Sequence, residues 1–451
     1  MKNRKQKNIK PQIIELYIDS LAAGGDGVGR VSVQKENSPD LNNSDANQSA
    51  NTPLGKVCFV PHTAPGDTVR AKVVSSNKKM MRATLVEVVS PGPGRQKPFC
   101  MHFGQCGGCQ WMHLSSEVQL QAKADILKRA LETEHVQMVP SPNTLGYRQL
   151  ARLHLISRIN KPPVLGFTKN KGIEVVDIAE CPILSKQLMD CVEPLKKGPL
   201  AHVKGKLEIR LSGGQNGPVV SFSSPVALDA EVYRELSLMV PKYLAGAVVE
   251  VDGIRSIVAG TGDIVIADNQ NNDSNNCAVI MPAGSFGQAN LQINELLKDT
   301  IARWVEKEQF ESAIELFAGA GNFSLVIGAH VKKLATAELD KEACKAARKN
   351  IELKKIKGVT VCQGDAAQIY RRQGSNCDLV VLDPPRTGNM DLAGEISQGD
   401  HRAVIYISCN PATLARDLAP LYFKGYKLKQ VVGFDMFPHT AHMEAAVLLT
   451  R

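Results

Sequence analysis

The stretch "ELFAGAGNFSL", residues 315–325, joins an apolar run typical of a strand to a run typical of a helix. Gly319 and Gly321 permit the tight turn and close ligand approach found where strands meet helices in doubly wound sheets. The dinucleotide fingerprint G-x-G-x-x-G is incomplete, because Ser324 stands at the third glycine's position. The turn therefore favours a cofactor without phosphates over one with a pyrophosphate. The same turn also occurs in doubly wound folds of other functions, so alone it leaves the ligand open.

Strand-like and helical segments alternate on both sides of this turn, from about residue 290 onward. The strand-like segments are "SAIELF", "KLATAEL", "GVTVCQG", "CDLVVLD" and "AVIYIS". This alternation predicts βαβ units and a parallel sheet. Glu338, near the end of the second strand, is placed to accept ribose hydroxyls, with Asp340 as the competing candidate, and Asp365 follows the third strand. Together these features resemble a class I S-adenosylmethionine methyltransferase.

Two further strand ends carry candidate reactive groups. Asp383 closes the fourth strand in "LVVLDPPRTG", and the two prolines after it stiffen the exit. Cys409 closes the fifth strand in "VIYISCNPATLARDL", two residues before Pro411, an early helix position. A helix dipole at this place would favour the thiolate relative to the free-cysteine pKa of about 8.5. Buried cysteines are usually inert packing, but the neighbouring acidic strand ends and Glu444, in "FPHTAHME", favour a reactive thiol.

A thiol and a carboxylate at one sheet edge suit a specific chemistry. Carbon 5 of uracil is a poor nucleophile until a thiolate adds to carbon 6 and converts the ring into an enolate. A base must then remove the proton from carbon 5 so that the thiolate is eliminated. The reaction therefore needs one nucleophile, one base and hydrogen-bond donors to the enolate. Amino-group methylation, for which an Asp-Pro-Pro element alone would also be suitable, needs no cysteine.

Three motifs, "SCNPATLARDL", "DPPRTG" and "FPHTAHME", resemble signatures of the RNA uracil-C5-methyltransferase family. The resemblance implies that S-adenosyl-L-methionine is the methyl donor, Cys409 the nucleophile and Glu444 the general base. The segment "GSFGQAN", residues 284–290, resembles the family's F-x-Q-x-N element. The implied cofactor and pocket residues are Gln288, Phe317, Asn322, Glu338, Asp365 and Asp383.

The roles of several neighbours stay open at this point. Arg386 is placed either to contact the enolate or RNA, or to be a surface charge. Gln288, taken without the other motifs, would read as part of an ordinary polar loop before a helix, and so would Asn290. Structural roles are expected for His439, Thr440 and His442.

The chain has 11 cysteines, an odd number that argues against a disulfide framework and for metal binding or catalysis. Cys100, Cys106 and Cys109 have x5 and x2 spacings, and Cys181 is the distant fourth candidate. Four thiolates can hold either zinc or an iron–sulfur cluster. The resemblance to ribosomal members of the family implies a [4Fe–4S] cluster, with a structural or RNA-binding role because methyl transfer needs no electrons.

Short alternating segments at residues 12–34 and 55–90 predict strands of a small barrel. They resemble a TRAM domain, an OB-like RNA-binding barrel. Aromatic residues are sparse there, so we expect backbone contacts from Lys56, Arg70, Lys72 and Arg82. The Asn/Ser-rich stretches at 36–53 and 268–276 predict disordered loops.

These patterns predict a multidomain α/β plus β protein. Its parts are a TRAM-type barrel at residues 10–95, a central α+β domain with the iron–sulfur cysteines at 96–280, and a class I (Rossmann-like) methyltransferase domain at 281–451. A helix at 115–132 is expected either in the central domain or packed on the catalytic domain.

The charge and hydropathy patterns bound the partners and the location. The net charge of +9 is compatible with a polyanionic partner, and the implied partner is 23S rRNA. Neither a secretory signal nor a long apolar run is present, so we expect a cytoplasmic, membrane-free protein. We also expect it to be a monomer. The rival hypotheses are the same chemistry on tRNA or on another rRNA uridine, and a non-catalytic RNA-binding iron–sulfur protein.

Overall fold

The computed structural model describes residues 12–31, 55–158, 161–169, 172–267 and 278–451. The two predicted polar loops, at 36–53 and 268–276, lie outside the described residues. The chain forms two compact units, each of which is described by itself. The first comprises Met1–Gly104, Cys109–Ile126 and His439–Ala441, and the second comprises Gln105–Gly108, Leu127–Pro438 and His442–Arg451.

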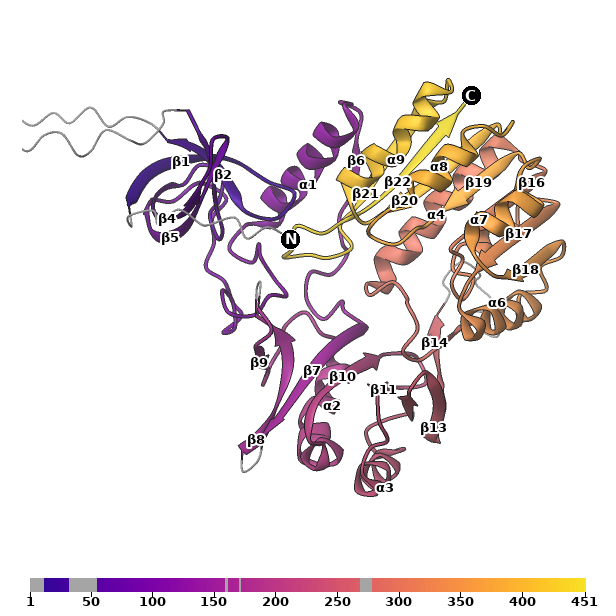
Figure 1. The fold of residues 1–451 in the computed structure, drawn as a ribbon, viewed down its shortest axis with the longest axis horizontal. Helices are drawn as coiled ribbons and strands as arrows, with labels where there is room; N and C mark the ends of the chain where they lie inside the picture. The colour runs from indigo at the N-terminus through magenta and orange to yellow at the C-terminus, as the bar shows by residue number, and fades with distance from the viewer. Residues whose placement is uncertain (1–11, 32–54, 159–160, 170–171, 268–277) are drawn as a thin grey trace, which may run out of the picture. The chain divides into compact units, whose positions relative to one another are not determined.

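The first unit contains a closed five-stranded barrel in the order β1-β2-β3-β5-β4 (Figure 1). Alternate residues of its strands point inward, and Leu16, Ile18, Val60 and Val69 are almost completely buried. Closure leaves no unpaired strand edge, as the alternating sequence predicted. The strands are β1 Ile13–Leu21, β2 Gly27–Val31, β3 Val57–Val60, β4 Thr68–Ser76 and β5 Met80–Ser90.

A seven-stranded sheet, in the order β13-β12-β11-β10-β7-β8-β9, lies in the second unit. Helices α2 and α3 cover one face, where Leu188 and Leu236 pack with Leu153, Ile209 and Phe222 of the strands. The elements, in chain order, are β7 Leu150–Arg158, β8 Lys161–Thr168, β9 Val175–Asp177, α2 Lys186–Lys197, η1 Pro199–His202, β10 Gly205–Ser212, β11 Val219–Ser224, α3 Ala230–Met239, β12 Gly246–Val251 and β13 Ile254–Gly260.

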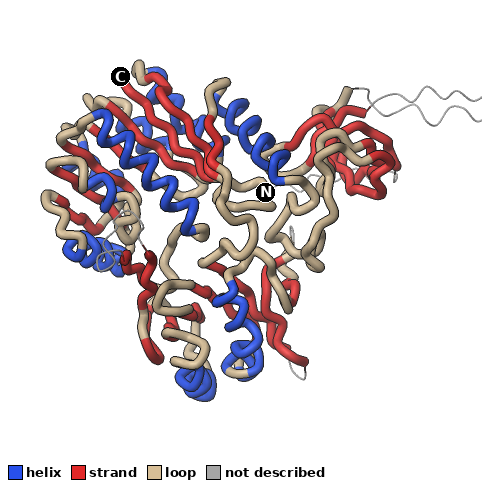
Figure 2. The backbone as a smooth tube through the Cα atoms, turned by 180° about the vertical axis from the view of Figure 1, so that it is seen from behind, coloured by secondary structure: helices blue, strands red, loops and turns tan. Residues whose placement is uncertain are grey.

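The second unit also contains an eight-stranded sheet, whose strands are among those drawn in red in Figure 2. We call it the catalytic sheet because the predicted catalytic residues lie on it, and its order is β18-β17-β16-β19-β20-β22-β21-β6. The five predicted strands are all present and pair in parallel. They are β16 Ser312–Leu316, β17 Lys333–Glu338, β18 Val359–Gln363, β19 Leu379–Leu382 and β20 Ala403–Ser408. Antiparallel β22 Glu444–Thr450 lies between β20 and β21 Lys427–Phe434. Side chains of the fully buried strands fill the core with no polar alternation, as is usual in parallel sheets.

Helices cover this sheet. Helix α4, Leu291–Glu308, and α5, Ser324–Gly328, pack through Leu297, Ile301 and Val326 on strand residues such as Ile405 and Leu448. The remaining helices are α6 Lys341–Leu353, α7 Ala366–Ile369, η2 Tyr370–Gly374, α8 Met390–Ile396 and α9 Pro411–Phe423. No helix in the described part of the chain is both long and apolar enough to cross a membrane.

The eighth strand, β6 Gln137–Val139, comes from an unexpected part of the chain. It pairs in parallel with β21, and the Asp435 amide donates to the Val139 carbonyl at 2.9 Å. It follows helix α1, Ser116–Leu131. The segment lies within the range assigned to the central domain, yet it extends the catalytic sheet. Only three residues pair, too few to leave a periodic signal in the sequence. The other predicted domain boundaries remain predictions.

A hairpin joins the central sheet to the catalytic part. It consists of β14 Asp263–Ala267 and β15 Ala278–Pro282. The side chain of Asn350 on α6 accepts from the Ile280 amide and donates to the Ile280 carbonyl, both at 2.8 Å. The same amide group donates to the Ala320 carbonyl at 3.0 Å. Asn350 thereby fixes the hairpin, and the "GSFGQAN" loop after it, beside the Gly-rich turn.

Candidate active site

The carboxyl ends of the parallel strands meet at one edge of the catalytic sheet. Leu316 of β16 pairs with Leu382 of β19, which in turn pairs with Tyr406 of β20. The residues that follow these strands, among them Asp383 and Cys409, therefore gather at this edge. This is the position where open α/β sheets bind ligands.

Cys409 and Glu444 lie opposite each other across β20 and β22. The last paired residues are Ser408 and Ala445, and one step further in the same antiparallel register brings residue 409 beside residue 444. Glu444 is only 5% exposed. The proximity is electrostatic as well as geometric, because the negative charge of Glu444 contributes to raising the pKa of the Cys409 thiol.

The expectation of a lowered Cys409 pKa is wrong for this structure. Burial above all, together with the charges of Glu444 and Asp383 and against the opposing charge of Arg386, raises the pKa of the thiol to about 11. Helix α9 begins after the cysteine as predicted, with Asn410 accepting from the Ala412 amide at 3.1 Å as its cap. Desolvation and two carboxylates thus outweigh the helix dipole.

Carboxyl groups are concentrated at this edge. Burial, followed by the charge of Asp383, raises the pKa of Glu444 well above its ordinary value. Burial raises the pKa of Asp383 to about 7. The pKa of Glu315 rises to about 8 through burial, with Asp383 and Glu338 adding to the shift. The Ser324 hydroxyl donates to Glu315. A cationic ligand would relieve this crowding of negative charge, so the donor set fits a sulfonium and ammonium cofactor.

The Gly-rich turn has the backbone that the sequence predicted. Gly319 and Gly321 have φ values of 56° and 89°, and Phe317 has a φ of 67°, which is rare for a bulky residue and is found mostly at functional sites. A side chain at Gly319 would meet no neighbouring atom within 4 Å, so its face is open to a ligand. The Gly319 amide donates to the Glu338 carboxylate at 2.8 Å.

The two candidates for the ribose-binding carboxylate differ in their contacts. Glu338 ends β17 and holds the Gly-rich turn. Asp340 instead caps α6 by accepting from the Ala343 amide at 2.6 Å. Helix capping thus accounts for Asp340, whereas the Glu338 carboxylate accepts from the Gly319 and Asp340 amides, and its role as the ribose acceptor remains a prediction.

Other predicted residues also have structural partners. Asn322 exchanges two hydrogen bonds with Asn294 of α4, at 2.8 and 2.9 Å. Asp365 caps α7 by accepting from the Gln368 amide at 3.0 Å. Asn290 caps α4, which agrees with the simpler reading of that position. Gln288 is buried in the loop between β15 and α4. Their cofactor and pocket roles remain predictions.

The expected structural role of His439 is consistent with its contacts inside the first unit. Its amide donates to the Gln119 carboxamide at 2.7 Å, and its carbonyl accepts from the Trp111 amide at 2.9 Å. Sequence reasoning overlooked two other residues, Glu315 and Asn294. Glu315 stood inside the quoted Gly-rich stretch, and a carboxylate in an otherwise apolar strand was the available signal. Asn294, within an ordinary helix, gave none.

The four candidate metal cysteines are partly buried. Cys100 and Cys109 belong to the first compact unit, and Cys106 and Cys181 to the second. Among the described residues, no group of three or more His, Cys, Asp or Glu side chains is arranged to hold a metal ion. The Gly108 amide donates to the Cys106 sulfur at 3.4 Å. The arrangement thus does not itself support an iron–sulfur site.

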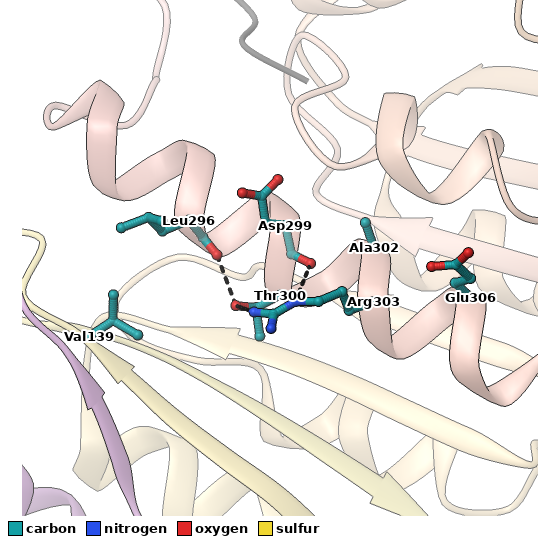
Figure 3. A pocket seen from close by; sticks show the side chains of 7 residues that line it. All are labelled: Val139, Leu296, Asp299, Thr300, Ala302, Arg303 and Glu306. Atoms are coloured by element: carbon teal, nitrogen blue, oxygen red, sulfur yellow. Dashed lines mark hydrogen bonds between the residues drawn. The ribbon is translucent and has the colours of Figure 1, made fainter. Parts of the chain in front are cut away.

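A hollow of about 390 Å³ lies on a different part of the second unit (Figure 3). Helix α4 lines it with strand β6, and inside it Arg303 donates to the Asp299 carbonyl at 3.2 Å. Its lining residues are Val139, Leu296, Asp299, Thr300, Ala302, Arg303 and Glu306. None of them is a predicted site residue.

Comparison with known proteins shows which families match parts of this chain. Residues 265–451 match the model of the tRNA (uracil-5-)-methyltransferase family, and residues 11–86 match the TRAM domain. The chain is a homologue of the RNA (uracil-C5)-methyltransferases. The TRAM prediction and the enzyme class, an S-adenosylmethionine-dependent RNA (uracil-C5)-methyltransferase, are confirmed.

Two curated relatives are similar over most of their length. The 23S rRNA (uracil(1939)-C(5))-methyltransferase RlmD of Photorhabdus laumondii is 28% identical, with 99% of this chain and 98% of the relative covered. The RlmD protein of Erwinia tasmaniensis is 29% identical, over 88% of this chain and 92% of the relative. The crystal structure of the Pyrococcus abyssi tRNA (uracil-54, C5)-methyltransferase with S-adenosyl-L-homocysteine has a TM-score of 0.71 and 23% identity, covering 97% of this chain and 100% of that one. That likeness confirms the fold, including the Rossmann-like methyltransferase part.

Proposed function

We propose that this methyltransferase transfers a methyl group from S-adenosylmethionine to carbon 5 of one uridine in 23S rRNA, through a covalent adduct with Cys409. The observation that carries the proposal is that Cys409 directly follows the Ser408–Ala445 pair of β20 and β22, within range of the charges of buried Glu444 and of Asp383. The two curated relatives act on uracil 1939 of 23S rRNA by their names, and we propose the same target here.

The first step assigns a role to the thiol. The Cys409 sulfur, as thiolate, bonds to carbon 6 of the uracil, and the electron pair of the carbon 5–carbon 6 double bond moves to form an enolate. Carbon 5 then has the electron density to take the methyl group, which S-adenosylmethionine supplies when bound. Because carbon 6 is inaccessible within a stacked helix, the target base has to leave its stack.

Glu444 completes the reaction as the base. It removes the proton from carbon 5, the double bond forms again, and the electron pair of the carbon–sulfur bond returns to Cys409. A carboxylate with a raised pKa is a stronger base than an exposed one, and burial raises the pKa of Glu444. With its pKa near 7, Asp383 can retain a proton near neutral pH and act as a hydrogen-bond donor in the pocket.

RNA binding is supported by cations on two parts of the chain. The barrel exposes Arg70 and Arg82. The face of the central sheet opposite α2 and α3, which the β14–β15 hairpin covers in part, carries Arg152 and Arg210 as direct cross-strand partners. Like charges at paired positions are destabilising, and among the described residues the two arginines share one carboxylate, that of Glu208, at 3.6 and 3.0 Å. A phosphate backbone across this face would compensate both arginines.

This face can be tested against a matched arginine. Arg210 donates to the Gly284 carbonyl at the start of the "GSFGQAN" loop, so Arg152 is the cleaner substitution. We expect Arg152→Gln to weaken RNA binding and to reduce the slope of log affinity against log salt by about 1. Arg234→Gln on α3, where the arginine side chain is 63% exposed against 62% for Arg152, serves as the control. Equal salt slopes for both variants would contradict the proposed RNA face.

We also propose that Cys100, Cys106, Cys109 and Cys181 hold a [4Fe–4S] cluster with a structural or RNA-binding role. The x5 and x2 spacing of the cysteines and the resemblance to ribosomal members of the family support it. Anaerobically purified protein should contain iron and sulfide and absorb in the visible range. Cys106→Ser should lose both, with Cys362→Ser as the control. Zinc in place of iron would contradict the cluster.

The decisive experiment is incubation with tritiated-methyl S-adenosylmethionine and unmodified 23S rRNA or tRNA, followed by nucleoside analysis. Label in 5-methyluridine from 23S rRNA supports the proposal. Label from tRNA alone would keep the chemistry and change the substrate, and no label from either would favour a non-catalytic RNA-binding protein. We further propose that the protein acts in the cytoplasm as a monomer without a membrane partner.

A further inference from the structure

Helix α9 carries a completely buried carboxylate, Asp417, to which the proposed reaction assigns no role. Its Oδ2 atom accepts from the Tyr406 hydroxyl at 2.6 Å and from the Asn389 amide at 2.7 Å. Its Oδ1 atom accepts from the Arg416 guanidinium at 2.8 Å. Three donors converge on one carboxylate that has no access to water. Each of them comes from a segment near the proposed reacting groups.

Those segments are the strand that ends at Cys409 and the loop that follows Asp383. Tyr406 lies on β20, three residues before the nucleophile. Asn389 is the last residue before α8, at the end of the "DPPRTG" loop. Asp417 therefore links the Cys409 strand to the Asp383 loop through a single side chain.

Additional contacts hold the loop against the start of α9. The Arg416 guanidinium donates to the Thr387 carbonyl at 2.8 Å, and the Arg386 carbonyl accepts from Thr413 at 3.3 Å. Gly388 has a φ of 67°, and a side chain there would come within 2.2 Å of the Asp417 carboxylate. The backbone at Gly388 is therefore shaped around this carboxylate.

We propose that Asp417 is a positioning residue, which sets Asp383 and Arg386 against Cys409. The inference rests on the proposed roles of Cys409 and Asp383. Both Asp383 and Arg386 influence the pKa of the Cys409 thiol, so their distance from the sulfur affects how the adduct forms. A misplacement of reacting groups by about 1 Å can lower a rate by about 10²-fold.

Asp417→Asn is the first test variant. The amide keeps the size of the side chain but turns one acceptor into a donor, which then faces Arg416 or the Tyr406 and Asn389 donors. We expect kcat to fall by about 10²-fold, whereas the KM for S-adenosylmethionine and the affinity for S-adenosylhomocysteine change by less than about 3-fold. Tyr406→Phe removes only one of the three hydrogen bonds and is expected to show the same selective loss at a smaller size.

The control makes the same chemical change at the opposite edge of the sheet. Asp378, just before β19, accepts from the Glu311 and Ser312 amides at 2.8 and 3.1 Å. Asp378→Asn should cost stability but leave kcat per folded molecule unchanged. Thermal melts give the folded fraction of each variant, so that unfolding is separated from misplacement.

The measurement is single-turnover formation of the covalent adduct on 5-fluorouridine-substituted 23S rRNA, whose fluorine at carbon 5 cannot be removed as a proton. Slower adduct formation by folded Asp417→Asn and Tyr406→Phe, with the wild-type rate for Asp378→Asn, supports the inference. Wild-type rates in both Asp417→Asn and Tyr406→Phe, or losses equal to the loss of folded protein, would overturn it while leaving the proposed function intact. Absence of adduct with the wild-type protein would instead overturn the proposed function, and the inference with it.

Discussion

Acidic side chains have opposite electrostatic environments at the two edges of the catalytic sheet. At the amino edge, Asp378 accepts hydrogen bonds from two backbone amides, and Glu311 forms a solvent-exposed ion pair with Lys332 at 2.6 Å. At the carboxyl edge, Glu315, Asp383 and Glu444 are crowded, and burial raises the pKa of each. Acidic side chains at the amino edge have hydrogen-bond donors or counter-ions. At the carboxyl edge, the charged groups that act on the acids are mainly other carboxylates.

This difference shows where the fold tolerates an electrostatic cost. Paired or hydrogen-bonded acids stabilise a fold, but clustered buried acids with raised pKa values oppose it. Such clusters gather at sites that bind charged ligands or transfer protons. The contrast therefore marks the carboxyl edge as the chemical edge of the sheet.

The largest expected effect comes from removing the nucleophile. Cys409→Ala should lower turnover by about 10⁴-fold or more, the scale found when other covalent enzymes lose their nucleophile. The measurement is methyl incorporation into unmodified 23S rRNA, with adduct formation assayed in parallel. Turnover near the wild-type level would contradict the covalent mechanism. Cys377→Ala, at the amino edge, is the matched control and should keep turnover per folded molecule.

A somewhat smaller loss is expected from Glu444→Gln. The amide cannot take the proton from carbon 5, so turnover should fall by about 10²–10⁴-fold. Because the preceding steps do not need this base, methylated RNA should remain attached to Cys409. A band of RNA-linked protein that survives denaturing electrophoresis would reveal the adduct. Its absence, in a variant that still binds RNA, would remove Glu444 from the role of base.

The crowded edge also predicts a pH dependence of stability. Glu315 has a folded pKa of about 8, against about 4.3 when unfolded, so the folded state binds more protons between these values. The free energy of unfolding should therefore fall as pH rises from about 4 to 8, by up to about 1.4 kcal/mol per pH unit for this group.

Glu315→Gln tests this dependence, because a neutral amide can still accept from Ser324. Urea denaturation from pH 5 to 8 should show a shallower fall for the variant than for the wild-type protein. Glu311→Gln makes the same chemical change at the amino edge and is the control. An unchanged pH slope in Glu315→Gln would contradict the assigned protonation.

The smallest effect belongs to the amino edge. Asp378→Asn should lower the free energy of unfolding by about 1–3 kcal/mol, the cost of weakening hydrogen bonds to buried or partly buried groups. Turnover per folded molecule should not change. Denaturant unfolding and initial rates on the same preparation provide the test, and a selective fall in kcat would show that the two edges are less independent than their contacts suggest.

Much of the catalytic part was predictable from local sequence. The strands ending near Phe317, Glu338, Asp383 and Cys409 were recognisable by their apolar runs, and the positive φ values followed from the glycines of the turn. Strand β6 was not predictable, because three residues at a sheet edge carry no period. Asn350 and Asp417 gave no signal either, because the sequence pattern of a helix does not distinguish a polar side chain that faces water from one that binds a buried backbone group.

The sequence by itself determined the order of elements, the strand ends on which candidate groups stand and the class of chemistry that those groups suit. Only the tertiary structure decided how those groups behave. A helix start after Cys409 suggested a lowered thiol pKa, but burial and the nearby charges of Glu444 and Asp383 raise it to about 11. The physical reason is that desolvation and Coulomb interactions depend on neighbours that are distant in the chain, whereas periodicity, capping and turn preferences depend on adjacent residues.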